Sequence, residues 1–367
     1  MFLRIPRRRY GRLVSVATLL TLSIFLLLPK SQSQPDFHEL SKKHPLLWRH
    51  VHSSNGTGGA WYIPPHWIQP SSSPPSTIVD VARLASQYAI SNNNTIAFSD
   101  IPLLVHQQWS DVNITHWADS IRQGAETWLK AAMSDNMAYF LWVDEGKQLL
   151  LDSYELSFNG HFHSLPRDIE RSDVIRVLAV KWFGGIYADI DTHLIRHPIS
   201  WLEPSDLAPW TEPSTNKTHP SLAKADKHNP IRAIFGLEAD CNPNEDTYWR
   251  SGYYFPVQLT QWAFAAAPDH PVLSLFVNQT SEVLRAVSIR NQGDLHSPGA
   301  KQEPMAVDPL VLTGPAAITG TVKSWLEQRE GVDWNSLTGS VDGGRSKTVG
   351  DVVVLPITGF RTTETTQ

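Results

Sequence analysis

Cysteine is almost absent from this 367-residue chain, since Cys241 is its only one. A lone cysteine excludes an intramolecular disulfide and a cysteine-rich zinc site, and we expect Cys241 to be free, buried and inert. Charge of one sign is also scarce, because 31 Lys and Arg stand against 36 Asp and Glu and give a formal net charge of −5. The chain therefore lacks the basic footprint of nucleic-acid-binding proteins, and no nucleic-acid partner is predicted.

The N-terminal part has the pattern of a membrane anchor. Five arginines within residues 4–12 precede an apolar run at residues 13–28, which Pro29 and Lys30 end. By the positive-inside rule, we expect a cytosolic tail at residues 1–12, a transmembrane signal anchor at 13–29 and a lumenal remainder. A cleaved signal peptide is the alternative.

Residues 30–99 are rich in Ser, Pro, Asn and Gly, which predicts an extended, poorly packed stem. Within it, residues 78–90 could form a helix that faces the domain through Val79, Ala82, Leu84 and Ala85. Asn-x-Ser/Thr sequons, which are used for N-glycosylation only in the secretory lumen, occur at Asn55, Asn93, Asn113, Asn216 and Asn278.

The lumenal part alternates strand-like and helix-like patterns. Apolar runs at residues 101–109, 137–143 and 186–192 predict strands, and helical spacing predicts helices at 115–133 and 168–183. This order is typical of an α/β fold with one catalytic domain and a mostly parallel sheet. In such sheets ligands bind beyond the carboxyl ends of the strands.

An acidic pair, Asp189 and Asp191, falls at the end of the last predicted strand. Side chains two apart in a strand share a face, so both carboxylates would point into one site. Two carboxylates suit Mn²⁺ or Mg²⁺, which completes its oxygen shell with substrate phosphates. Two exposed aspartates in a turn would give the same letters.

The preceding helix places Asp173 and Arg176 three residues apart on one face. A carboxylate and a guanidinium so placed could both hydrogen-bond sugar hydroxyl groups. The alternative is a surface ion pair, which contributes less than about 1 kcal/mol.

Several motifs resemble, in order, those of the glycosyltransferases with a sugar-binding region containing a DXD motif, family 32. They lie at residues 101–109, 142–144, 171–176 and 184–191. Later segments resemble the fungal branch typified by the initiation-specific α-1,6-mannosyltransferase of N-glycan outer chains, and they lie at 235–240, 261–262, 270–271, 313–315 and 351–360. The resemblance makes residues 100–360 the lumenal catalytic domain.

The resemblance implies a GT-A-like (Rossmann-like) fold, GDP-mannose as donor, Mn²⁺ (or Mg²⁺) as cofactor, and retention at the anomeric carbon. It also implies a single-pass type II protein of the Golgi membrane. Asp189 and Asp191 would serve the metal and the diphosphate, and Asp173 and Arg176 would hold the donor sugar.

Other residues receive roles from the same resemblance. Val105, His106 and Gln107 would line the nucleotide pocket, although His106 could instead be a satisfied core histidine. The further donor-side residues are Trp109, Tyr187, Thr313 and Gly314, and weaker acceptor-side candidates are Glu238 and Asp240. Trp142, Trp182 and Trp262 sit on apolar segments that favour core packing, as does the segment of Trp109.

The function implied is transfer of mannose to an N-glycan by an α-1,6-mannosyltransferase. One alternative is a hexosyltransferase that acts on a sphingolipid or another glycan. A second is a weakly active or inactive scaffold subunit of a mannosyltransferase complex. It is motivated by residues 361–367, a short irregular tail where the family has a segment with His and a Gly-Ser-Trp-like element.

Overall fold

The computed structural model describes residues 37–68, 75–221, 231–295, 297–340 and 342–360. The chain divides into two compact units, residues 1–43 and 44–367. In the first unit, the described part is helix α2 (Phe37–Lys43). The predicted cytosolic tail, anchor and C-terminal tail lie outside the described residues. Within the described part, no single helix is long and apolar enough to span a membrane, and one helix pair bent by 91° passes by length and composition alone.

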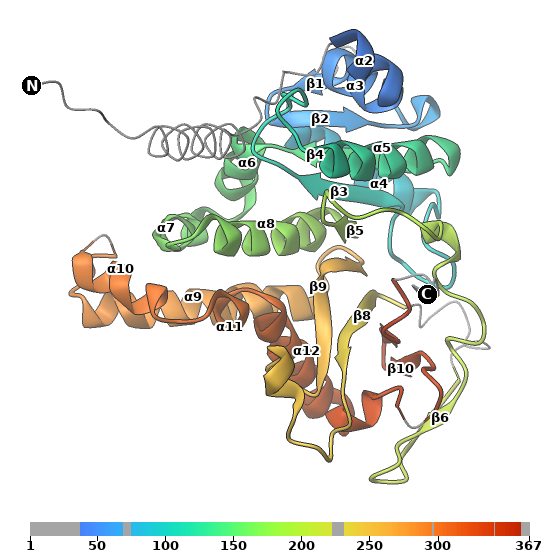
Figure 1. The fold of residues 1–367 in the computed structure, drawn as a ribbon, viewed down its shortest axis with the longest axis vertical. Helices are drawn as coiled ribbons and strands as arrows, with labels where there is room; N and C mark the ends of the chain where they lie inside the picture. Colours follow the sequence, from blue (N-terminus) through green and yellow to red (C-terminus); the bar gives the residue numbers. More distant parts are fainter. Residues whose placement is uncertain (1–36, 69–74, 222–230, 296, 341, 361–367) are drawn as a thin grey trace, which may run out of the picture. The chain divides into compact units, whose positions relative to one another are not determined.

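The second unit is built on a nine-stranded sheet with the order β1-β2-β4-β3-β5-β9-β8-β11-β10 (Figure 1). Its strands are β1 (Asn55–Gly56), β2 (Gly59–Tyr62), β3 (Leu104–Gln108), β4 (Ala138–Trp142), β5 (Gly185–Ala188), β8 (Ala233–Asp240), β9 (Val257–Ala266), β10 (Lys347–Val349) and β11 (Val352–Leu355). Only β3–β4, β3–β5 and β8–β11 pair in parallel. The α/β class is confirmed, but the prediction of a mostly parallel sheet is wrong, because the sheet is mixed. A separate hairpin joins β6 (Trp210–Thr211) to β7 (Thr218–His219).

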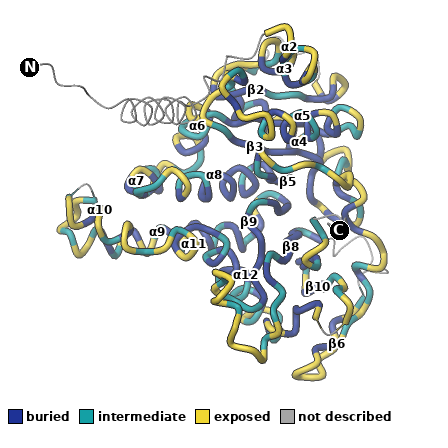
Figure 2. Tube along the Cα trace, in the orientation of Figure 1, coloured by how far each residue is buried: buried dark blue, intermediate teal, exposed yellow. Residues whose placement is uncertain are grey.

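Helices cover both faces of this sheet. They are α3 (Pro45–Ser53), α4 (Ile78–Ser91), α5 (Asp119–Ser134), α6 (Asp144–Tyr154), α7 (Leu156–Ser164), α8 (Asp168–Phe183), α9 (Pro271–Arg290), α10 (Pro298–Met305), α11 (Pro309–Leu312) and α12 (Pro315–Glu330). Short 3-10 turns are η1 (Pro65–Trp67), η2 (Pro198–Ser200), η3 (Tyr248–Ser251) and η4 (Trp334–Leu337). Figure 2 shows the central strands and most of α8 buried.

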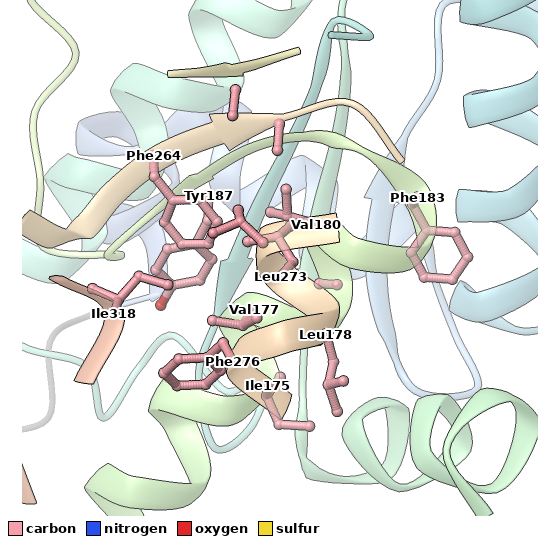
Figure 3. Packing of buried hydrophobic residues seen from close by; sticks show 14 of the residues in the cluster. Ile175, Val177, Leu178, Val180, Phe183, Tyr187, Phe264, Leu273, Phe276 and Ile318 are labelled. Carbon is pink, nitrogen blue, oxygen red and sulfur yellow. The ribbon is translucent and has the colours of Figure 1, made fainter. Parts of the chain in front are cut away.

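Successive strand residues feed two different hydrophobic clusters, because strand side chains alternate between faces. Leu104 and Tyr187 pack with residues of α4, α8, α9 and α12, whereas Val105 and Ile186 pack with residues of α3 and α5. Figure 3 shows part of the first cluster, which contains Val177 of α8 and Phe276 of α9. Helix α8 lies inside this cluster, which fixes its position relative to β5.

Around the acidic pair, the predicted helix is present but the predicted strand ends earlier than expected. Helix α8 spans the predicted residues and ends at Gly184, whose φ of 67° favours glycine. Strand β5 stops at Ala188, so the predicted strand to residue 192 is wrong. Asp189 and Asp191 lie in a turn that closes with a 3.0 Å hydrogen bond from the Thr192 amide to the Asp189 carbonyl.

The predicted stem is packed protein over residues 44–68 and 75–99. Strand β2 pairs with β4, and Val79, Ala82 and Ala85 of α4 are buried in the core, although Leu84 is 43% exposed. The glycines that indicated a loop have another role. A Cβ atom at Gly59 would lie 2.1 Å from the Leu141 carbonyl oxygen, so glycine lets β2 approach β4.

Two smaller predictions concern exposed and buried positions. Cys241 is free, as predicted, but only half-buried. The sequon asparagines are all exposed, namely Asn55, Asn93, Asn113, Asn216 and Asn278. Of these side chains, that of Asn55 donates through Nδ2 to the Val51 carbonyl at 2.7 Å.

His106 of β3 is a satisfied core histidine. It is fully buried, its Nδ1 accepts a hydrogen bond from Trp142 Nε1 at 3.1 Å, and its Nε2 lies 2.9 Å from the Gly184 carbonyl oxygen. Because the carbonyl only accepts and the indole only donates, the ring is neutral with its proton on Nε2. Burial lowers the pKa of His106 from 6.5 to about 4, although the bond to Gly184 opposes the shift.

This depressed pKa predicts a loss of stability in acid. The unfolded His106 takes up a proton near pH 6.5 while the folded one stays neutral, so its contribution is complete above pH 6.5 and is lost toward pH 4. Between pH 7 and pH 5 we expect His106 by itself to lower the free energy of urea unfolding by about 2 kcal/mol, and His106→Gln should remove that contribution. The exposed His116, changed to Gln, is the control. An equal pH dependence in wild type and His106→Gln would contradict this account.

Candidate functional site

A cleft of about 700 Å³ lies at one edge of the sheet. Strands β3, β4 and β5 run parallel, so the residues that follow them meet at this edge. Gln108 and Trp109 lie at the end of β3, Asp144 lies two residues beyond the end of β4, and Asp189 directly follows β5. The remaining wall is formed by Ser110, Lys147, Gln148, Phe162, His163, Asp168, Ile169, Arg171, Ser172, Arg176, Tyr187, Ile190 and Asp191.

The two aspartates of the turn differ in their surroundings. Asp189 Oδ1 accepts a 2.7 Å hydrogen bond from the Tyr187 hydroxyl and lies 3.2 Å from Arg176 Nη2. Its side chain is 29% exposed. Asp191 is exposed, and no described residue forms a hydrogen bond or ion pair with its carboxylate. One carboxylate is thus fixed and the other is free to bind a ligand.

Arg176 is held between carboxylates inside the protein. Its Nη2 lies 3.3 Å from Asp173 Oδ1, and its Nη1 donates to the Gln261 carbonyl at 3.1 Å. Asp173 Oδ2 accepts from the Thr313 hydroxyl at 3.0 Å. The side chains of Asp173 and Arg176 are only 6% and 10% exposed, so the surface ion pair considered above is wrong. Arg176 lines the cleft, whereas Asp173 lies behind it and positions Arg176.

Burial dominates the electrostatics of these carboxyl groups. It raises the pKa of Asp173 to about 6, against the opposing effects of Arg176 and Thr313. It also raises the pKa of Asp189, although Arg176 and Tyr187 favour the charged form, and the neighbouring Asp191 adds to the rise. A cation bound at the turn would therefore relieve a negative charge that is poorly solvated.

Helix α5 supports the turn from behind. A Cβ atom at Gly124 would lie 2.3 Å from the Ile190 carbonyl oxygen, so only glycine lets the helix approach this closely. One helical turn later, Trp128 Nε1 donates to Thr192 Oγ1 at 3.0 Å. These contacts hold the backbone on which both aspartates sit.

The turn suits a hard divalent cation when a substrate supplies further oxygens. Within the described ranges, no group of three or more His, Cys, Asp and Glu side chains could hold a metal alone. Asp191 and the second oxygen of Asp189 could provide carboxylate ligands, which Mg²⁺ and Mn²⁺ prefer, and such ions commonly use one or two carboxylates together with substrate phosphates.

Residues of β3 that were predicted to line the pocket lie beneath it. Val105, His106 and Gln107 are fully buried and take no part in the cleft wall. Gln107 supports the turn, because its Nε2 donates to the Asp189 carbonyl at 3.2 Å while its Oε1 accepts from the Tyr139 hydroxyl at 2.8 Å.

The other predicted residues fall into two groups. Trp109 and Tyr187 line the cleft, and Thr313 contacts it indirectly through Asp173. Gly314 caps the N-terminus of α12. Glu238 accepts from Gln258 Nε2 at 3.2 Å, and Asp240 accepts from the Gly339 amide at 2.9 Å. Neither acid lines the cleft.

Two basic side chains that line the cleft were not predicted as site residues. Lys147 pairs with Asp144 at 2.8 Å, and Arg171 is held by Asp168 and the Leu165 carbonyl. Both pairs have helical i, i+3 spacing, which occurs on many exposed helices and gave no signal of a site.

Known proteins resemble this part of the chain. Residues 118–208 match the family model described as "Glycosyltransferase sugar-binding region containing DXD motif". The matched segment is similar to that region. The resemblance that the motifs indicated is therefore confirmed, and the matched segment contains α5, α8, β5 and the acidic turn.

Curated relatives extend the similarity to about half of the chain. The initiation-specific alpha-1,6-mannosyltransferase of Saccharomyces cerevisiae is 31% identical over 208 residues, covering 53% of this chain and 42% of that protein. The protein of the same name from Schizosaccharomyces pombe is 26% identical, covering 59% and 47%. Inositol phosphoceramide mannosyltransferase 3 of S. pombe is 31% identical over 96 residues, covering 25% and 24%. The chain thus matches less than half the length of each relative.

The close contact between α5 and the turn yields a stability prediction. Gly→Ala inside a helix normally stabilises by up to about 1 kcal/mol, but at Gly124 the methyl group meets the Ile190 carbonyl oxygen. We expect Gly124→Ala to lower the free energy of urea unfolding by about 1–3 kcal/mol. Gly160 of α7, where a Cβ atom meets nothing within 4 Å, is the matched control and should tolerate alanine. Equal behaviour of the two variants would show that the contact does not constrain the turn.

Proposed function

We propose that the protein is a retaining mannosyltransferase that uses GDP-mannose and Mn²⁺ or Mg²⁺ to extend a glycan. The observation that carries this proposal is the acidic turn, in which a fixed Asp189 and an unpartnered Asp191 face a cleft at the carboxyl ends of three parallel strands. The family match over this turn and the mannosyltransferase relatives support it.

In this proposal Asp191 and the outer oxygen of Asp189 hold the cation together with the donor diphosphate. A cation bound there neutralises charge that develops on the departing diphosphate. Lys147 and Arg171 also line the cleft, where their positive charges attract phosphate oxygens.

Arg176 is the residue best placed to orient the donor sugar. Its guanidinium is fixed by Asp173, Asp189 and the Gln261 carbonyl, and it lies 5.0 Å from the centre of the Tyr187 ring. A planar donor that is fixed before substrate arrives loses little entropy on binding a hydroxyl group. Trp109 offers an apolar ring at the end of β3 for the base or ribose.

The acceptor is proposed to be an N-glycan, because the relatives named for the initiation-specific reaction match over half of the chain. Relatives named for inositol phosphoceramide match over a quarter of it, which makes a sphingolipid the second candidate. Product analysis with both acceptors separates the two.

The proposed location is the Golgi lumen, with the chain anchored through residues 13–29 as a type II membrane protein. The surface position of all five sequon asparagines supports a lumenal domain, since N-glycosylation requires asparagines at the surface. Removal of N-glycans by an endoglycosidase should reduce the apparent mass of the protein from its native host.

Substitution of the acidic turn tests the proposed function. With GDP-mannose and Mn²⁺, Asp189→Ala and Asp191→Ala should each lower kcat/KM for transfer by at least about 10²-fold, because each removes charge stabilisation at the leaving group. Asp246, an exposed aspartate of the loop after β8, serves as the matched control when changed to Ala.

Two results would count against the proposal. If both turn variants keep wild-type activity, the acidic turn is not the metal site of the reaction. A wild-type protein that neither transfers mannose nor hydrolyses GDP-mannose with Mn²⁺ would favour the inactive subunit of a mannosyltransferase complex.

A further inference from the structure

A second cavity, of about 550 Å³, lies against the other end of the acidic turn. Along the turn, Asp191 is the last residue that lines the first cleft, and Thr192 is the first that lines the second cavity. No residue lines both. The turn therefore borders two binding spaces, of which the proposed function uses only the first.

The second cavity is tied directly to the backbone of the turn. The Asp189 amide donates to the Trp262 carbonyl at 2.8 Å, and Thr192 Oγ1 donates to the Asp189 carbonyl at 2.5 Å. Trp262 and Thr192 both line the cavity. A molecule bound in the second cavity would therefore lie close to Asp189, which also lines the first cleft.

Aromatic rings line part of this cavity. The Phe360 ring centre lies 4.9 Å from that of Trp201 and 6.1 Å from that of Trp262. Trp201 is buried, whereas Trp262 and Phe360 are half-buried and keep ring surface accessible. Gly236 of β8 makes the seat for Phe360, since a Cβ atom there would lie 2.4 Å from the phenyl ring.

Polar groups line the rest of the cavity. His193 and Arg345 are exposed, and neither imidazole nor guanidinium has a hydrogen-bond or ion-pair partner among the residues that the structure describes. Asp206 lies nearby, where its Oδ1 accepts from Ser346 Oγ at 2.8 Å. Donors, acceptors and apolar ring faces are thus combined in one space.

This combination matches a sugar ring better than an alkyl chain. A hexose presents C–H groups on its faces and hydroxyl groups around its edge, so rings and polar side chains can be used together. An alkyl chain would leave His193 and Arg345 desolvated without a partner, which costs free energy. A transferase also needs its second substrate next to the donor site.

We propose that the second cavity binds a neutral hexose unit of the acceptor glycan, with Trp262 as the platform under the ring and Arg345 as a hydrogen-bond donor. The proposal rests on the proposed function, because it assigns the second substrate of that reaction. It places the acceptor on the opposite side of the acidic turn from the donor cleft.

A binding measurement tests this without turnover. Saturation-transfer difference NMR with α-1,6-mannobiose, on the full chain with GDP and diamagnetic Mg²⁺ present, gives the Kd for the sugar. We expect Trp262→Ala to weaken mannobiose binding about tenfold and Trp262→Phe to restore most of it, with the Kd for GDP unchanged. Trp249, 56% exposed on η3, is the matched control when changed to Ala.

Unchanged mannobiose binding in Trp262→Ala would overturn the proposal. So would a loss of GDP binding with no loss of mannobiose binding, since the cavity would then belong to the donor. If Trp262→Ala fails to fold, Arg345→Ala decides instead: a severalfold weaker binding supports the assignment, and wild-type binding overturns it. Sugar binding without any mannose transfer would remove the proposed function and leave the sugar site, so the two failures are distinguishable.

Discussion

The position of Asp189 constrains most of what surrounds it. Its carboxylate accepts from Tyr187 and contacts Arg176, its carbonyl accepts from Gln107 and Thr192, and its amide donates to the Trp262 carbonyl. Apart from Thr192 of the turn itself, these partners come from β3, β5, α8 and β9, so four elements meet at one residue. The sheet and its covering helix α8 therefore hold the backbone of the turn. Asp191, two residues later, lies on this held backbone although its own carboxylate has no partner.

A buried charge network gives this arrangement its rigidity. Arg176 lies between Asp173 and Asp189, and both carboxyl groups have a raised pKa because they are buried. Removing one partner from such a network leaves an uncompensated buried charge, which typically costs about 3–5 kcal/mol. The network therefore holds the Arg176 guanidinium in one place at the cleft wall. Its cost is that substitution of any one of these three residues alone destabilises the fold.

The spacing of apolar residues predicted α8, β3 and β4, because helical spacing and short apolar runs depend only on neighbours in the sequence. The acidic pair of the site was likewise readable from the sequence. The mixed sheet could not be predicted this way, since β9 enters between β5 and β8 by long-range antiparallel pairing. The turn at Asp189 has the same letters as a strand end, so the sequence alone does not show where the strand stops. His106 followed the family motif, but strand alternation directs it into the core with Phe140 and Trp142.

The central claim is that the acidic turn holds a divalent cation together with a nucleotide diphosphate. Titration of Mn²⁺ followed by electron paramagnetic resonance, with and without GDP, tests it most directly. The account predicts one Mn²⁺ site per chain that tightens when GDP is added, because the diphosphate completes the oxygen shell, and that is lost in Asp191→Asn. Mn²⁺ binding that is indifferent to GDP, or that survives unchanged in Asp191→Asn, would contradict it.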